Sequence, residues 1–174
     1  MEPTQVYWDD VEVGQEIPSL VKRPTHIQML MWGAAVDDYN PMHADREIAT
    51  RAGYHEPIVF GPLVFSFLEQ MLTDWMGVAG WLKKITVRHN DPAFAGDDVI
   101  CRGKISDKYE KDGEHYVELQ IQADYPSGEQ GTVGSAIVAL PLKAHAPTLP
   151  SAEPIPTSPW LRIAALGKPV EPEV

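Results

Sequence analysis

The sequence predicts an α+β fold in which an antiparallel sheet wraps around one central, buried helix. The first observation is a segment at helical spacing that is apolar nearly all round, because every residue from Leu63 to Leu68 except Ser66 is hydrophobic. A helix without a polar face is buried. The second observation is a change to a hydrophobic period of two after Trp81, which indicates strands. One buried helix followed by antiparallel strands is an α+β pattern.

Helices are predicted ahead of the strands. Thr25, followed three residues later by a glutamine, fits a capping box and predicts a helix over about residues 26–36. Asp45 is a suitable cap for a short helix that ends at Gly53. The buried helix begins at the Gly61-Pro62 pair, since proline is favoured at the first helical position, and it stops at the next glycine.

The strands are predicted from the alternation of apolar and polar residues. The alternation is clearest where valine, leucine, isoleucine and alanine alternate with glutamate and glutamines. A hairpin turn is predicted at Asp112-Gly113. The strands lie at about residues 81–88, 99–105, 117–123 and 131–140.

The length of 174 residues predicts one domain, which we place at residues 1–141. A proline-rich C-terminal tail follows at residues 142–174, and eight of the 16 prolines lie from Pro141 onward. Such a segment forms little regular secondary structure. Two interpretations stay open for it: it wraps the surface or a partner subunit, or it is disordered.

Charge and cysteine content limit the partners. The net charge of −11 disfavours nucleic acid. The polar, acidic N-terminus is unlike a signal peptide, and no apolar run has transmembrane length, so we expect a cytoplasmic protein with no membrane partner.

Cys101 is the only cysteine, which excludes an internal disulfide and a cysteine metal site. The histidines show no metal-ligand spacing, so no metal is expected.

Residues 38–43, Asp-Tyr-Asn-Pro-Met-His, carry the strongest functional signal. Asn40-Pro41 is a turn signal, because proline disfavours the α region for the residue before it. A helix cannot run through this pair, so Asp38 and His43 can converge on one point. A carboxylate and a histidine that share a water molecule can move protons in both directions near neutral pH. The alternative is that the run only stops a helix and that His43 is a surface residue.

Residues 38–43 resemble the Asp-x-Asn-Pro-x-His signature of the MaoC-like hydratases, the (R)-specific 2-enoyl-CoA hydratases. The likeness continues in further segments and covers roughly residues 5–141 in all. These segments are residues 7–15, residues 53–54 with 58–62, and residues 92–97.

The resemblance implies a hot dog fold and a hydratase. Its substrate would be a 2-enoyl-CoA or a related thioester on an acyl carrier, and its product a (3R)-hydroxyacyl thioester. Asp38 and His43 would hold the catalytic water. The resemblance implies neither a metal nor a redox cofactor. It also implies a homodimer with the site near the subunit interface.

Hydration of an enoyl thioester needs a base, an acid and donors for the enolate oxygen. Asp38 and His43 can supply the first two, and the sequence leaves open which is the base. The start of the buried helix can supply the donors, because its first amide groups lack intrahelical partners. Since proline has no N–H, these donors are Gly61 and Leu63, with the next residue. Asn40 is expected to hold the loop through side-chain hydrogen bonds.

The chain departs from the family pattern at two positions. Asp37 stands where a glycine commonly precedes the aspartate, and Phe60 stands where a histidine commonly precedes the helix start. Phe60 makes the pocket more apolar and indicates a bulky or apolar acyl group. Phe60 and Ser66 are the predicted substrate-binding side chains. The alternative for Ser66 is a hydrogen bond to its own helix backbone.

A carrier such as coenzyme A is polyanionic, which the net charge of −11 disfavours unless basic side chains gather at one mouth. We expect such a patch on two neighbouring strands, with a solvated sheet face as the alternative. Its members are Lys83, Lys84, Arg88, Arg102 and Lys104.

Other functions remain in competition. Some hot dog thioesterases use a helix carboxylate, and Glu69 on the buried helix is the candidate here. A third reading is a non-catalytic subunit of a two-chain hydratase, against which the intact motif argues. Among the other histidines His89 stands out, because it ends a candidate strand.

Overall fold

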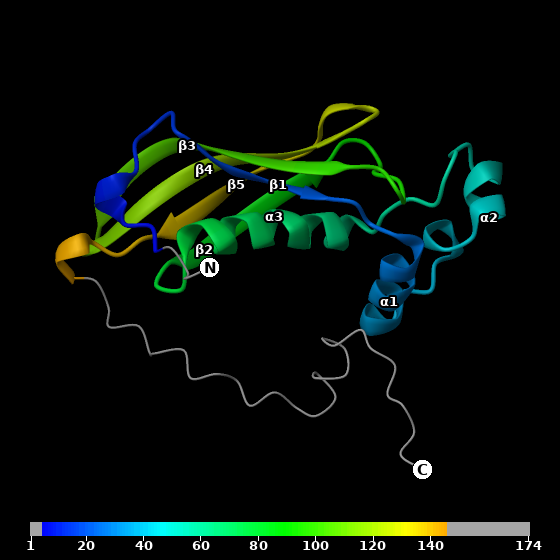
Figure 1. Cartoon of the computed structure of the whole chain (residues 1–174), viewed down its shortest axis with the longest axis horizontal. Coiled ribbons are helices and arrows are strands. Elements are labelled where there is room, and N and C mark those ends of the chain that lie inside the picture. Colours follow the sequence, from blue (N-terminus) through cyan, green and yellow to red (C-terminus); the bar gives the residue numbers. More distant parts are fainter. Residues whose placement is uncertain (1–4, 146–174) are drawn as a thin grey trace, which may run out of the picture.

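A five-stranded antiparallel sheet forms the body of the protein, and one long helix lies along its concave side (Figure 1). The computed structural model describes residues 5–145 of the 174. The strand order is β1-β3-β4-β5-β2, with every neighbouring pair antiparallel. The strands are β1 (Glu16–Lys22), β2 (Trp81–His89), β3 (Val99–Lys111), β4 (Glu114–Tyr125) and β5 (Gly128–Ala139).

The long helix is α3 (Gly61–Met76), and it supplies much of the hydrophobic core. Eight of its side chains are buried. The sheet contributes the inward-facing residues of its central strands, which alternate with exposed polar residues as the period of two requires. The buried residues of α3 are Leu63, Val64, Phe67, Leu68, Met71, Leu72, Trp75 and Met76.

Strand β3 has a glycine where it crosses the helix. A Cβ atom on Gly103 would lie 2.9 Å from the Cδ1 atom of Ile17 and 3.3 Å from the Cε atom of Met71. Any side chain there would therefore have to displace the side chain of Ile17. The neighbouring Cys101 is fully buried, and burial raises the pKa of its thiol to about 12. This cysteine packs as a small hydrophobic residue.

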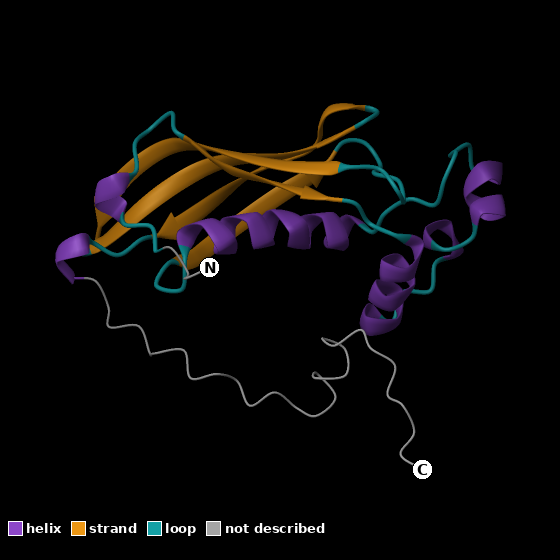
Figure 2. Cartoon of the chain, in the orientation of Figure 1, coloured by secondary structure: helices purple, strands orange, loops and turns teal. Residues whose placement is uncertain are grey.

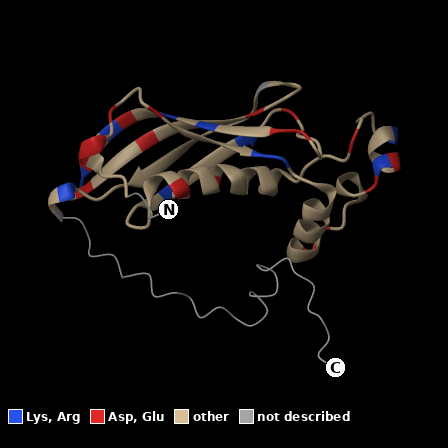
Figure 3. Cartoon of the chain, in the orientation of Figure 1, with Lys and Arg blue, Asp and Glu red and all other residues tan. Residues whose placement is uncertain are grey.

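A smaller helical region links β1 to α3 and lies beyond one end of the sheet (Figures 1 and 2). It consists of α1 (His26–Val36), the 3₁₀ turn η2 (Pro41–His43) and α2 (Arg46–Arg51). None of the residues in α1 is a lysine, arginine, aspartate or glutamate, so this helix is uncoloured in the charge view (Figure 3). The motif at residues 38–43 follows α1 and includes η2, and its last residue contacts the residue before α3.

The sequence predicted these helices well. Thr25 caps α1 by accepting a hydrogen bond from the N–H of Gln28. Asp45 caps α2 in the same way. At the hairpin, Asp112 and Gly113 both have positive φ, of 52° and 78°, as a tight turn of the predicted type requires.

Strand β1 was not predicted. Its sequence contains Pro18, which lacks an N–H and demotes a run to an edge strand. The structure places β1 at the sheet edge, and its register with β3 shifts between Ile17 and Leu20, on either side of that proline. The irregularity that accommodates the proline also interrupts the alternation of apolar and polar residues from which the other strands were predicted.

The predicted basic patch on neighbouring strands was wrong. Strands β2 and β3 are separated by β5 and β4, so their lysines and arginines do not line one shared edge. Two of them also have acidic partners: Arg102 forms an ion pair with Asp124 at 2.9 Å, and Lys83 with Glu114 at 2.7 Å. The solvated sheet face was the correct alternative for these residues.

The division into a domain at 1–141 and a tail at 142–174 stays a prediction. Just after the last strand, the backbone N–H of Trp8 donates to the carbonyl of Pro141, and Lys143 contacts Asp9 and Asp10. The predicted fate of the remaining tail lies outside the described residues. Within residues 5–145, no helix is long and apolar enough to cross a membrane.

Replacement of Leu68 by alanine should lower the free energy of unfolding by about 2–5 kcal/mol, because this fully buried side chain would leave a cavity under the sheet. Val78→Ala is the control, since Val78 is 65% exposed and should change stability by less than about 0.5 kcal/mol. Urea unfolding followed by circular dichroism, at one fixed protein concentration, measures both. Equal effects of the two variants would contradict the central position of α3.

Candidate active site

The loop that carries the motif begins with an unusual helix end. Asp37 caps α1 in the left-handed conformation, with φ 58° and ψ 33°. That position is normally taken by glycine, because other residues are strained there. The chain turns sharply at this residue, and the N–H of Asp38 donates to the carbonyl of Gly33 at 3.0 Å. Asp37 thus adopts the backbone conformation that a glycine would favour.

Two side-chain hydrogen bonds then shape the loop. The Oδ1 atom of Asp38 accepts from the N–H of Asn40 at 3.1 Å, and the Oδ1 atom of Asn40 accepts from the N–H of Met42 at 3.1 Å. Pro41 starts the 3₁₀ turn that ends at His43. Each bond spans two residues, so the loop stays tight and its two ends remain close.

The imidazole of His43 is fixed on both its edge and its face. Its Nδ1 atom lies 2.7 Å from the carbonyl oxygen of Ile58. A carbonyl only accepts, so Nδ1 carries the proton and Nε2 of the neutral ring is left to exchange protons. The ring also stacks on Phe60, with centroids 3.8 Å apart and an interplanar angle of 25°.

Asp38 and His43 line the same small cavity, of about 100 Å³. Asp38 is exposed and His43 is half-buried. One wall is Gly33, where a Cβ atom would lie 2.8 Å from the carbonyl oxygen of Asp38 and 3.1 Å from Cζ of Phe60. The other lining residues are Met29, Leu30, Ala34, Tyr39, Asn40, Ala44 and Phe60. The structure therefore brings together the two residues that the sequence predicted to converge.

The start of α3 adjoins this cavity through Phe60, its N-cap residue. Among residues 5–145 the N–H of Gly61 has no acceptor, whereas the N–H of Leu63 donates to the carbonyl of Phe60 at 3.0 Å. Of the two predicted backbone donors, Gly61 is the one whose amide is available. The hydroxyl of Ser66 donates to the carbonyl of Leu63 at 2.8 Å, within its own helix.

A second imidazole lies at the same helix start, and sequence reasoning had given it no role. His89 ends β2, and its Nε2 atom would lie 3.1 Å from a Cβ atom on Gly61. Its Nδ1 atom lies 2.8 Å from the hydroxyl of Thr132. Desolvation lowers the pKa of the His89 imidazole below its usual value. The only sequence signal was its position at a strand end, because its contacts come from residues far along the chain.

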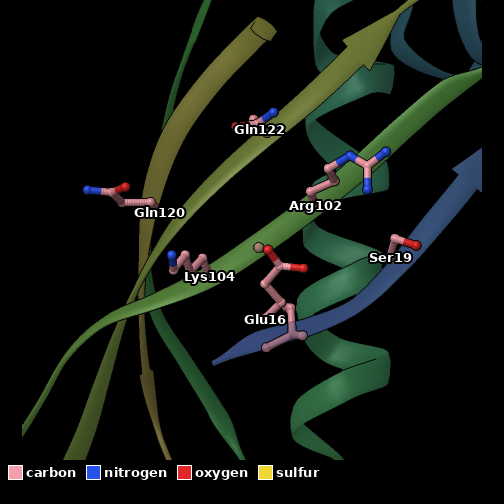
Figure 4. Close-up of a pocket in the computed structure, with 8 residues that line it drawn as sticks. Glu16, Ser19, Arg102, Lys104, Gln120 and Gln122 are labelled. Atoms are coloured by element: carbon pink, nitrogen blue, oxygen red, sulfur yellow. The ribbon is translucent and has the colours of Figure 1, made fainter. Parts of the chain in front are cut away.

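Other polar clusters lie elsewhere. In the described part of the chain, no group of three histidine, cysteine, aspartate or glutamate side chains is placed to hold a metal ion. A hollow of about 300 Å³ opens on the face of the sheet away from α3 (Figure 4). Its side chains come from β1, β3 and β4, and Figure 4 shows Glu16, Arg102 and Lys104 among them. This hollow does not include residues of the motif.

Comparison with known proteins decides the family. The family model described as "MaoC like domain" matches residues 10–125. The chain belongs to the MaoC-like family. The resemblance found in the sequence is thereby confirmed.

This MaoC-like protein is similar to an (R)-specific enoyl-CoA hydratase of Aeromonas caviae, with 26% identity over 132 residues. The match covers 75% of this chain and 96% of that protein. The solved (R)-hydratase of Aeromonas caviae, described as involved in PHA biosynthesis, superposes with a TM-score of 0.68 at 26% identity. The superposition covers 76% of this chain and 98% of the Aeromonas caviae chain.

More distant structures confirm the hot dog fold of this MaoC-like protein. The R-hydratase PhaJ1 of Pseudomonas aeruginosa has a TM-score of 0.71 at 22% identity and covers 86% of this chain and 96% of its own. The ChsH1-ChsH2 complex of Mycobacterium tuberculosis has a TM-score of 0.64 at 21% identity. The match covers 74% of this chain and 98% of the chain in that complex.

Asp37→Gly should raise the free energy of unfolding of this MaoC-like protein by roughly 0.5–1 kcal/mol, because glycine adopts the left-handed conformation without strain. Asp107→Gly in β3 is the control and should be destabilising, since glycine weakens a strand. Thermal unfolding of the wild type and both variants measures the effects. A loss of stability in Asp37→Gly would show that the aspartate side chain outweighs the backbone strain.

Proposed function

We propose that this protein is a hydratase that adds water across the C2–C3 double bond of a 2-enoyl thioester and gives a (3R)-hydroxyacyl thioester. The observation that carries the proposal is the shared cavity of Asp38 and His43 beside the free amide of Gly61. The similarity to an (R)-specific enoyl-CoA hydratase, over 96% of that protein's length, supports the same reaction class and stereochemistry.

In the proposed reaction, one water molecule is held between the carboxylate of Asp38 and the Nε2 atom of His43. One of the two groups removes a proton as the water oxygen attacks C3, and the other delivers a proton to C2. All proton exchange at His43 passes through Nε2, because the carbonyl of Ile58 holds the proton on Nδ1. Both groups approach from one side, so both new bonds form on one face of the alkene.

Negative charge develops on the thioester oxygen during the attack. The amide of Gly61 is a suitable donor, because it has no acceptor among the described residues and lies at the positive end of the α3 dipole. In this proposal Asn40 keeps the loop in shape, since its side chain bonds the turn that carries His43.

The cavity favours an apolar acyl group. Phe60 and Met29 are buried against it, and its volume of about 100 Å³ admits only a few heavy atoms next to the motif. The apolar part of the sequence prediction for Phe60 is therefore supported, whereas a bulky group finds little room there. Ser66 bonds its own helix, which favours the alternative weighed for that residue over substrate binding.

The substrate carrier is coenzyme A or an acyl carrier protein, and the proposed mechanism uses neither a metal nor a redox cofactor. We further propose a cytoplasmic homodimer with the site near the subunit interface. A two-chain hydratase is the alternative, and the presence of both proton-transfer residues in this chain favours an active subunit.

Hydrolysis of the thioester is the second candidate reaction. It would need an inward-facing carboxylate on α3, but Glu69 is exposed and does not line the cavity. This placement favours hydration over hydrolysis. Release of free thiol from acyl-CoA distinguishes the two, since hydration consumes the conjugated absorbance without releasing thiol.

Asp38→Asn and His43→Ala should each lower kcat for hydration by about 10²–10⁴-fold, because each removes a proton-transfer group. The measurement follows loss of enoyl absorbance on trans-2-enoyl-CoA esters of increasing chain length and branching. Asp37→Asn is the matched control: it removes a carboxylate one residue away, and asparagine tolerates the left-handed conformation.

Near-wild-type turnover in Asp38→Asn or His43→Ala would refute the assigned roles. Equal losses in Asp37→Asn would point to a disturbed loop instead of lost chemistry. Thiol release in place of hydration would establish the thioesterase alternative.

A further inference from the structure

His89, an exposed residue at the end of β2, begins a chain of three hydrogen-bonded polar side chains that the proposed mechanism does not use. The Nδ1 atom of His89 lies 2.8 Å from the hydroxyl of Thr132, and that hydroxyl lies 2.6 Å from the hydroxyl of Tyr125. Thr132 is fully buried and Tyr125 is 6% exposed. His89 and Thr132 are directly opposite each other on β2 and β5.

The direction of these hydrogen bonds follows from proton counting. Either hydroxyl of the Tyr125–Thr132 pair could donate, but among the described residues Tyr125 has no other partner, so we assign its proton to the threonine oxygen. A buried phenol without an acceptor would be unfavourable, and a phenol is a better donor than acceptor. The threonine hydroxyl has one proton, which it then donates to Nδ1 of His89. With this assignment, the imidazole proton of His89 lies on Nε2.

The edge of the imidazole that carries Nε2 lies against the first residue of α3. The Nε2 and Cδ2 atoms would lie 3.1 and 3.2 Å from a Cβ atom on Gly61, so any side chain there would displace the imidazole by a few tenths of an ångström. Gly61 also carries the free amide, and its neighbour Phe60 stacks on His43. A thioester oxygen that accepted a hydrogen bond from the Gly61 amide would therefore lie close to the imidazole of His89.

We propose that His89 contacts the substrate and donates a hydrogen bond from Nε2 to the thioester oxygen, as a second donor beside the amide of Gly61. This inference rests on the proposed hydration reaction. It assigns opposite tautomers and different roles to the two imidazoles. His43 exchanges protons at an unprotonated Nε2 atom, whereas His89 stabilises the enolate through a protonated Nε2 atom.

The proton balance of the reaction is unchanged by this role. A neutral imidazole is a weak acid and keeps its proton, so the enolate oxygen gains a hydrogen bond and no proton. The proton for C2 still comes from the Asp38 and His43 pair. Desolvation lowers the pKa of His89, which favours the neutral form of its ring.

A purely structural role would need only the cross-strand bond from Nδ1 to Thr132. The two roles are separated by a pair of variants. In His89→Asn, the amide occupies the place of Nδ1 and retains the bond to Thr132, but nothing reaches Gly61. In His89→Gln, the longer side chain places an amide N–H near the position of Nε2.

We expect His89→Asn to lower kcat by about 10²-fold with little change in KM, and His89→Gln to stay within about tenfold of the wild type. His115→Phe is the control, because His115 packs against Trp8 outside the site and should keep full activity. Circular dichroism and the unfolding midpoint check that each variant folds.

A second measurement uses the unmodified protein and does not depend on how the variants fold. Long-range ¹H–¹⁵N correlation spectra of the histidine rings, recorded at a pH of about 8, report the tautomers directly. We expect the proton of His89 on Nε2 and the proton of His43 on Nδ1.

Unchanged kcat in His89→Asn, equal losses in the Asn and Gln variants, or a proton on Nδ1 of His89 would each overturn this inference. If the wild type and His115→Phe hydrate the substrate and His89→Asn does so equally well, only the role of His89 fails. If the wild type hydrates none of the thioesters, the proposed function fails and this inference fails with it.

Discussion

Burial of α3 against the concave side of the sheet is the constraint on which the site depends. The helix is held along its length by a close-packed core, so its first residue has a fixed position. That residue is Gly61, and the groups of the candidate site are arranged around it. Phe60 holds His43 nearby by ring stacking, and β2 brings His89 against Gly61. The hydrophobic core thus fixes the position of the candidate site, although few core residues line that site.

Local patterns were sufficient to predict the helices, the hairpin and the motif loop. Each of these depends on residues close in sequence: Thr25 caps its own helix, and Asn40 bonds a residue two positions away. The convergence of Asp38 and His43 was predictable for the same reason, because a proline-containing turn of six residues leaves few arrangements. The helix start at Gly61-Pro62 was equally local.

What could not be predicted depends on contacts between distant segments. The hydrophobic periodicity of a strand does not reveal which strands are its neighbours. The adjacency of β2 and β5 was therefore missed, and a basic patch was wrongly expected. The surroundings of His89 come from Thr132, 43 residues away, and from a helix start that precedes its strand. Strand β1 was hidden by the proline that its edge position tolerates.

The single thiol of the protein has a practical consequence. Cys101 is fully buried beneath the sheet, with a pKa raised to about 12, so in the folded protein almost none of it is the reactive thiolate. Thiol reagents will modify it only when β3 separates from the core. The rate at which a thiol reagent labels Cys101 therefore reports how often the central sheet opens, and the measurement requires no engineered probe.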